Sequence, residues 1–95
     1  HFVRQDQPYY VYIVTCSDGT LYTGVTNNLC TRINKHNLGQ GSKYTRGRRP
    51  VTLAYYEQLS GSSEALKREI QIKRMSRASK LALVKSWSTI AETMK

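Results

Sequence analysis

One segment near the start of the chain constrains the fold more than any other. Residues 9–16 (YYVYIVTC) are almost all aromatic or β-branched, and residues 21–26 (LYTGVT) repeat that composition. Such residues favour β-strands, and the Asp18-Gly19 pair between the two runs is a strong signal for a tight antiparallel turn. The sequence therefore predicts a β-hairpin over residues 9–26.

Alternation along the strands decides which tyrosines of this hairpin lie together. Successive side chains point to opposite faces, so Tyr10, Tyr12 and Val14 share one face of the first strand. Tyr22 and Gly24 share one face of the second strand by the same rule. Because the two strands pair across a short turn, we expect Tyr12 and Tyr22 to approach one another.

The remainder of the chain predicts a small α+β domain in the order ββαβαα, with a three-stranded, mainly antiparallel sheet flanked by helices. At 95 residues there is room for a single domain, which we expect over residues 9–89 after an N-terminal tail of residues 1–8. After the hairpin we expect a helix over 28–38, a Gly-rich basic loop over 40–50 and a strand over 51–57. Two further helices should follow, one over 64–75 and one that runs to about residue 89. The expected caps of the three helices are Thr26 or Asn27, Ser62 or Ser63, and Ser76.

The charge of the chain indicates its partner. Fifteen lysines and arginines oppose six acids, and residues 32–80 hold twelve of the basic residues against Glu57, Glu64 and Glu69. A basic excess of this size favours a polyanion, because a cationic surface binds phosphates by releasing counterions. The alternative is a solvated basic surface that binds nothing.

The chain gives no sign of a membrane or secreted protein. Its longest apolar runs fall short of the roughly 20 residues of a membrane span, and residues 1–8 are too polar for a signal peptide. Cys16 and Cys30 lack metal-ligand or disulfide spacing, so we expect both to be reduced. These observations predict a soluble cytoplasmic protein.

A resemblance to a known family adds to this interpretation. The run Tyr10-Val11-Tyr12, nine further residues and then Tyr22-Thr23-Gly24 resembles the paired motif of the GIY-YIG nucleases. Tyr10, Val11 and Thr23 depart from that motif. Downstream, the chain is similar to the family in its arginine Arg32, in His36 one helical turn later, in a basic loop and in a glutamate, Glu69, of the following helix. It resembles most the small stand-alone bacterial members.

The resemblance implies a catalytic site for phosphodiester hydrolysis made by Tyr12, Tyr22, Arg32, His36 and Glu69. One tyrosine would position or deprotonate the attacking water, and Tyr12 is slightly favoured over Tyr22. An unperturbed tyrosine pKa is near 10, so the base needs a neighbouring cation or metal. Arg32 would hold the phosphate, and His36 would share a proton with the leaving group or bind a phosphate. The structural alternatives are cross-strand packing of the tyrosines, a solvated arginine and a buried histidine.

Glu69 is the expected metal ligand, for Mg²⁺ or Mn²⁺, because a hard cation needs only one or two carboxylates and keeps several waters. The competing interpretation is an ion pair with Lys73 at i,i+4. Tyr44 would stack on an unpaired base. The residues expected to bind nucleic acid are Lys35, Lys43, Tyr44, Arg46, Arg48, Arg49 and Lys73.

The expected function is a metal-dependent endonuclease acting on structured or single-stranded DNA, in repair or recombination. DNA is favoured over RNA as the substrate. A nucleic-acid-binding module that has lost turnover, or that cuts only when a protein partner supplies specificity, is the main alternative. A protein-interaction domain with incidental basicity is a third hypothesis.

Overall fold

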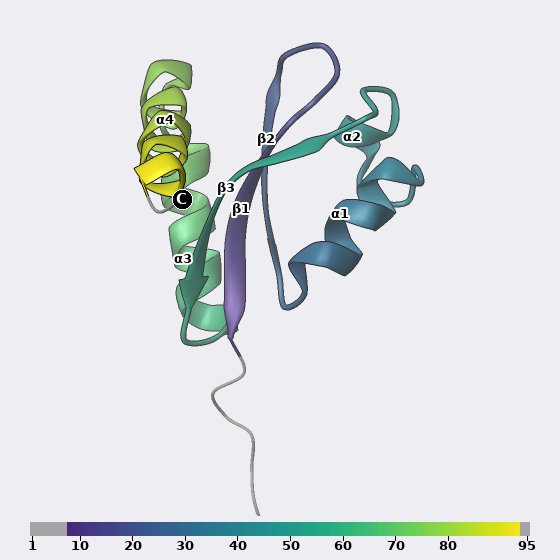
Figure 1. The fold of residues 1–95 in the computed structure, drawn as a ribbon. Helices are drawn as coiled ribbons and strands as arrows, with labels where there is room; N and C mark the ends of the chain where they lie inside the picture. Colours follow the sequence, from purple (N-terminus) through teal and green to yellow (C-terminus); the bar gives the residue numbers. More distant parts are fainter. Residues whose placement is uncertain (1–7, 94–95) are drawn as a thin grey trace, which may run out of the picture.

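The structure, a computed structural model, describes residues 8–93 and confirms the predicted α+β fold (Figure 1). The order ββαβαα holds, with one short helix added in the basic loop, where the sequence predicted no helix. The elements are β1 (Tyr9–Thr15), β2 (Leu21–Thr26), α1 (Leu29–Asn37), α2 (Lys43–Arg46), β3 (Thr52–Leu59), α3 (Ser62–Lys73) and α4 (Arg77–Thr93).

The sheet has the order β2-β1-β3, and β1 pairs antiparallel with both neighbours. Residues Val11–Val14 of β1 have no exposed surface at all. A central strand that is covered on both sides needs apolar side chains on both of its faces. This burial explains why β1 has no polar face. Strand β2 is left as one edge of the sheet, and Tyr12 pairs with Gly24 on it.

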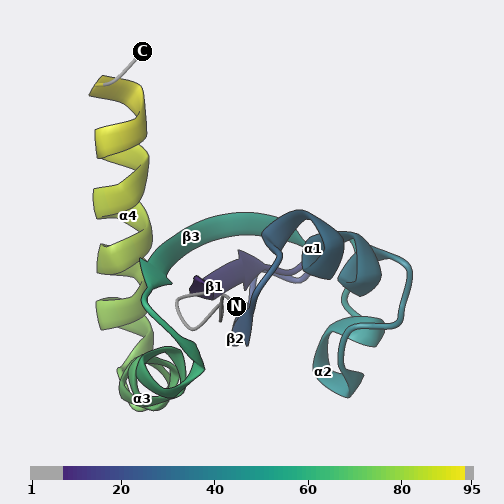
Figure 2. The ribbon, with the colours of Figure 1, turned by 90° about the horizontal axis from the view of Figure 1, so that it is seen from below.

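Two apolar clusters lie on opposite faces of the sheet. Val11 and Ile13 pack against Ala65 and Ile72 of α3. On the other face Tyr12, Val14, Cys16 and Val51 pack with Leu29 and Ile33 of α1 and with Tyr22 and Leu53. Figure 2 shows this separation, with α3 and α4 on one side of the strands and α1 and α2 on the other. Within residues 8–93, no helix has the length and apolar character needed to cross a bilayer.

Two of the predicted helix caps are wrong and one is confirmed. Asn28 caps α1 by accepting a hydrogen bond from the Thr31 amide at 3.0 Å, because the Thr26 hydroxyl is occupied as the acceptor for the Asn28 amide. Helix α3 begins at Ser62 after Gly61 and has no side-chain cap. Ser76 caps α4 as predicted, by accepting from the Ser79 amide.

Gly24 allows Tyr12 to reach the β2 edge. A Cβ atom at residue 24 would lie 2.5 Å from the Tyr12 Oη and 2.7 Å from its Cζ. The hydroxyl end of the Tyr12 ring therefore lies over the backbone of β2, in space that any other residue would fill. Glycine in a strand interior commonly marks such a close approach.

We predict that Gly24→Ala lowers the stability of the domain by about 1–3 kcal/mol, because the new methyl group forces the buried Tyr12 ring to move. Gly47→Ala is the matched control, since a Cβ at residue 47 meets nothing within 4 Å and the backbone φ is not positive. Urea unfolding of the two variants makes the comparison. An unchanged midpoint for Gly24→Ala would contradict this packing.

Candidate active site

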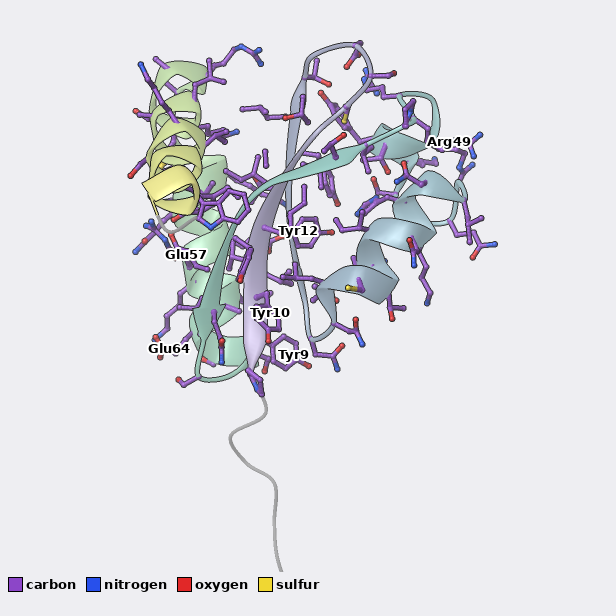
Figure 3. All side chains as sticks on the ribbon, in the orientation of Figure 1. Tyr9, Tyr10, Tyr12, Arg49, Glu57 and Glu64 are labelled. Atoms are coloured by element: carbon purple, nitrogen blue, oxygen red, sulfur yellow. The ribbon has the colours of Figure 1, made fainter. Side chains whose placement is uncertain are left out.

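Tyr12 and His36 meet in the interior between the sheet and α1. The Tyr12 Oη lies 2.8 Å from the His36 Nε2, and the His36 Nδ1 lies 2.8 Å from the Thr45 Oγ1. All three side chains have no exposed surface. Figure 3 shows the Tyr12 ring extending from β1 towards α1. One continuous hydrogen-bonded path thus joins β1, α1 and α2.

The loop before α2 is folded tightly onto this histidine. A Cβ atom at Gly41 would lie only 2.1 Å from the His36 Nδ1, so the backbone of the loop rests against the imidazole ring. Ser42 then caps α2 by accepting from the Thr45 amide, which brings the Thr45 hydroxyl to the ring. The sequence G-S-x-x-T is therefore what closes the loop over His36.

Arg32 completes the network from the solvent side. Its Nε donates to the Tyr12 Oη at 3.3 Å, and its Nη2 donates to the Gly41 carbonyl at 3.2 Å. A guanidinium only donates. We therefore assign the phenol proton of Tyr12 to the bond with His36, and the proton of His36 to Nδ1, from which it is donated to Thr45. The Nη1 atom of Arg32 makes no hydrogen bond within the described residues, and the half-buried side chain reaches the surface.

The pKa values of the buried pair fit neutral side chains. Burial raises the pKa of the Tyr12 phenol; the hydrogen bond and charge of Arg32 oppose this, and the charges of Tyr22 and Glu69 add to it. Burial, and then the charge of Arg32, lowers the pKa of His36. At neutral pH both groups are uncharged. A histidine without exposed surface does not reach a phosphate directly, so the geometry favours a positioning role for His36 over phosphate binding.

Tyr22 is the accessible member of the tyrosine pair. It is half-buried, whereas Tyr12 is fully buried. Its ring lies edge-on to His36 with centroids 5.5 Å apart, and it stacks on Tyr44 at 5.8 Å. Tyr12 is also edge-on to His36, at 5.9 Å. The expected approach of Tyr12 and Tyr22 is therefore made through the imidazole ring that both contact.

Glu69 comes to this region from α3, which packs on both β1 and β2. Its carboxylate affects the pKa of Tyr12, so the two side chains lie within electrostatic range although α1 and α3 cover opposite faces of the sheet. The side chain is 17% exposed, and its Oε2 lies 3.1 Å from the Nζ of Lys73. The i,i+4 ion pair weighed as the alternative to metal binding is therefore present.

The other acids of the basic segment are placed differently. Glu57 is held by the Arg68 guanidinium at 2.9 Å and by the Tyr55 hydroxyl. Glu64 lies on the exposed side of α3, 3.9 Å from Lys67. Among the side chains that the structure describes, residues 8–87, no group of three His, Cys, Asp or Glu that could hold a metal occurs. Of these three acids, Glu69 is the one that acts electrostatically on Tyr12, and one carboxylate suffices for a hard cation that keeps its waters.

The predicted nucleic-acid-binding residues divide into two groups. Arg48 binds Asp18 at 3.0 Å and lies 4.0 Å from the centre of the Tyr44 ring, and Arg49 donates to the carbonyls of Arg46 and Asn37. These two arginines hold the loop, and a base would have to displace Arg48 or Tyr22 to stack on Tyr44. The predicted cations that are exposed and make no side-chain hydrogen bond or ion pair in the described part of the chain are Lys35, Lys43 and Arg46.

Sequence reasoning missed several residues beside this region. Thr45 and Gly41 carried a local signal, since Ser42 and Thr45 have the spacing of a capped turn. The sequence around Arg77 and Lys80 carried no such local signal beyond the charge of the two residues. The Arg77 Nη2 donates to the Gly19 carbonyl of the hairpin turn at 3.0 Å, a contact across 58 residues that only the tertiary fold reveals.

The domain brings two tyrosines, an arginine and a histidine into contact beside a basic loop, and Glu69 acts electrostatically on Tyr12. A family model described as the GIY-YIG catalytic domain matches residues 8–82. The chain belongs to the GIY-YIG family, a nuclease family whose members generally depend on metal and act on nucleic acid. The domain limits of residues 9 and 89 remain a prediction.

The chain is also similar to individual bacterial proteins. The chain is 56% identical over 77 residues to a UPF0213 protein of Staphylococcus aureus strain Mu50, covering 81% of this chain and 94% of the relative. It is similar to the solution structure of the UPF0213 protein BH0048 from Bacillus halodurans, with 44% identity, a TM-score of 0.54 and coverage of 82% and 83% of the two chains. Protein EF2693 from E. faecalis has 32% identity and a TM-score of 0.59 over 92% and 93%.

We predict that the stability of the domain falls as the pH is lowered from about 6.5, the ordinary histidine value, through the lower pKa of folded His36. The unfolded chain takes up the proton first, because the folded state keeps His36 neutral. Urea unfolding across this range measures the effect, and His36→Gln should remove this part of the pH dependence. An NMR titration showing His36 protonated at or above pH 6.5 in the folded protein would contradict the assignment.

Proposed function

We propose that this protein is a metal-dependent endonuclease that hydrolyses phosphodiester bonds in structured or single-stranded DNA, in repair or recombination. The observation that carries the proposal is the buried Tyr12–His36 pair, which Arg32 and Tyr22 both contact and on which Glu69 acts electrostatically. Tyr22 comes from the edge strand, Arg32 from α1 and Glu69 from α3. Their positions are supported by the buried contact between Tyr12 and His36.

Tyr22 is our preferred group for positioning or deprotonating the attacking water. The sequence alone slightly favours Tyr12, but Tyr12 is fully buried and its proton is committed to His36. Water reaches the partly exposed Tyr22 more readily. Tyr12 and His36 are then positioning residues, which orient Arg32 and the Tyr22 ring through one hydrogen bond and one ring contact.

Arg32 supplies the positive charge for the transition state. Two of its nitrogens are fixed by Tyr12 and Gly41, which leaves Nη1 for a phosphate oxygen. A guanidinium restrained in this way needs little reorganisation as negative charge develops, and preorganised donors of this kind make large contributions to catalysis.

Glu69 would hold the Mg²⁺ or Mn²⁺ ion. When bound, the cation would polarise the phosphate and stabilise the leaving oxygen. The ion pair between Glu69 and the half-exposed Lys73 contributes only about half a kcal/mol, so its replacement by a divalent cation is energetically accessible. Lys73 would then be released for a neighbouring phosphate.

The surface around the site supports a nucleic-acid substrate. Lys35, Lys43 and Arg46 are exposed cations near α1 and α2. Such cations bind phosphates rather than base edges. We therefore propose that the protein recognises the shape of the nucleic-acid backbone. A protein partner would supply any further specificity.

A binding module without turnover is the second candidate, and the contact between Glu69 and Lys73 is the observation that favours it. If that ion pair persists in the presence of metal and nucleic acid, the site lacks its carboxylate ligand. The chain would then bind nucleic acid in a salt-dependent way without cutting it.

We predict that Tyr22→Phe lowers the cleavage rate by about 10²–10⁴-fold, the range typical for removal of a positioned proton-transfer group. Glu69→Gln should abolish metal-dependent cleavage, because it removes the carboxylate that would hold the cation. Labelled single-stranded, branched and duplex DNA, and RNA, would be offered with Mg²⁺, Mn²⁺ or EDTA. Tyr56→Phe and Glu64→Gln are matched controls on β3 and α3, at exposed positions outside the site, and should cut at the wild-type rate.

Two results would contradict the proposal. Cleavage that survives both substitutions would place the activity elsewhere, and cleavage in EDTA would remove the role of the metal. Salt-dependent binding with no turnover on any substrate would favour the second candidate.

A further inference from the structure

A small cleft that Tyr44 helps to line lies beside the hairpin turn. It has a volume of about 170 Å³, and its walls come from the hairpin turn, from α2 and from the first turn of α4. In Figure 1 the hairpin turn and the start of α4 both lie at the upper end of the molecule. The lining residues are Thr20, Leu21, Tyr44, Arg77 and Lys80.

The charges around the cleft favour an anion. Arg77 and Lys80 both line it, whereas no acidic residue does. The acid of the hairpin turn, Asp18, is paired with Arg48 at 3.0 Å and also accepts from Thr20. Lys80 makes no side-chain hydrogen bond or ion pair within residues 8–93, and Arg77 uses one nitrogen on Gly19. Two cationic residues therefore line the cleft, and the acid of the neighbouring hairpin turn is already paired.

The size of the cleft limits what it can hold. Pockets for whole cofactors or drug-sized ligands are about 300–1,000 Å³. A volume of 170 Å³ suits a single phosphate group and is too small for a nucleotide. The side chains that line it are suited to a phosphate and offer no pattern of donors and acceptors for reading a base.

Tyr44 connects the cleft with the proposed catalytic tyrosine. Its ring stacks on Tyr22 and also forms one wall of the cleft. Arg48 fixes this ring from a distance of 4.0 Å and donates to the Tyr44 carbonyl at 2.7 Å. Tyr44 therefore both lines the cleft and contacts Tyr22, and Arg48 holds it in a defined position.

We propose that this cleft, through Arg77 and Lys80, binds a backbone phosphate of the same strand that is cut, next to the phosphate attacked at Tyr22. The inference rests on the proposed function and deepens it. A strand held at both points crosses the β2 edge past Tyr44, so the substrate must extend beyond the cut on the side of the cleft. The chain would accordingly act within a strand and without sequence preference.

The test is binding of a short fluorescent oligothymidine to the full chain in EDTA, where no metal-dependent cleavage occurs. We expect the double variant Arg77→Gln, Lys80→Gln to weaken binding about tenfold, and to reduce the slope of log K against log salt by about one, as the loss of a phosphate contact does. Lys80→Gln alone should weaken binding in the same direction while leaving the Arg77 bond to Gly19 intact. Lys67→Gln, an exposed lysine of α3, removes the same charge elsewhere and should bind like wild type.

The outcomes separate this proposal from the nuclease proposal. Unchanged affinity and salt slope in both cleft variants would overturn the cleft site, even where the wild type cuts DNA. Weakened binding in these variants, with no cleavage by the wild type, would support the cleft and refute the endonuclease. Equal weakening by Lys67→Gln would show a general charge effect and overturn the cleft proposal. Absence of oligonucleotide binding by the wild type would overturn the cleft proposal, whereas the endonuclease proposal is decided by the cleavage assay with metal.

Discussion

The hydrogen bond between Tyr12 and His36 is the contact on which the rest of the site depends. It joins the central strand to α1, and its continuation to Thr45 fixes α2 and the loop before it. Because none of these groups is exposed, each must find its partner within the protein, and a buried polar group left unpaired would be strongly destabilising. The position of Arg32 follows from the same contact, since it donates to the Tyr12 oxygen.

Glycine at two positions makes this contact possible. Gly24 lets the Tyr12 ring lie across the edge strand, and Gly41 lets the loop backbone close on the imidazole. As a consequence, the two tyrosines differ in their exposure to solvent. Tyr12 is fully buried, whereas Tyr22 is half-buried. The paired-tyrosine motif does not by itself indicate this difference in exposure.

The fold was predictable because local signals agree with one another. The Asp-Gly turn between two β-branched runs defines the hairpin, and the capping serine before α4 marks its start. The short helix α2 escaped prediction because four residues carry too little periodicity. The convergence of Tyr22, Arg32 and Glu69, which the family resemblance implies, stays a prediction. The contact of Arg77 with the hairpin turn could not be inferred from the sequence, because the local sequence of a helix or a turn does not show which distant element it will contact.

The central claim is that side chains from both faces of the sheet meet at the β2 edge around one divalent cation. Titration of the isotope-labelled protein with Mn²⁺, followed by paramagnetic broadening of amide signals, measures this directly. The account predicts broadening centred on Glu69 and Tyr22, and its loss in Glu69→Gln. Broadening centred on Glu57 or Asp18, or broadening that Glu69→Gln leaves unchanged, would contradict it.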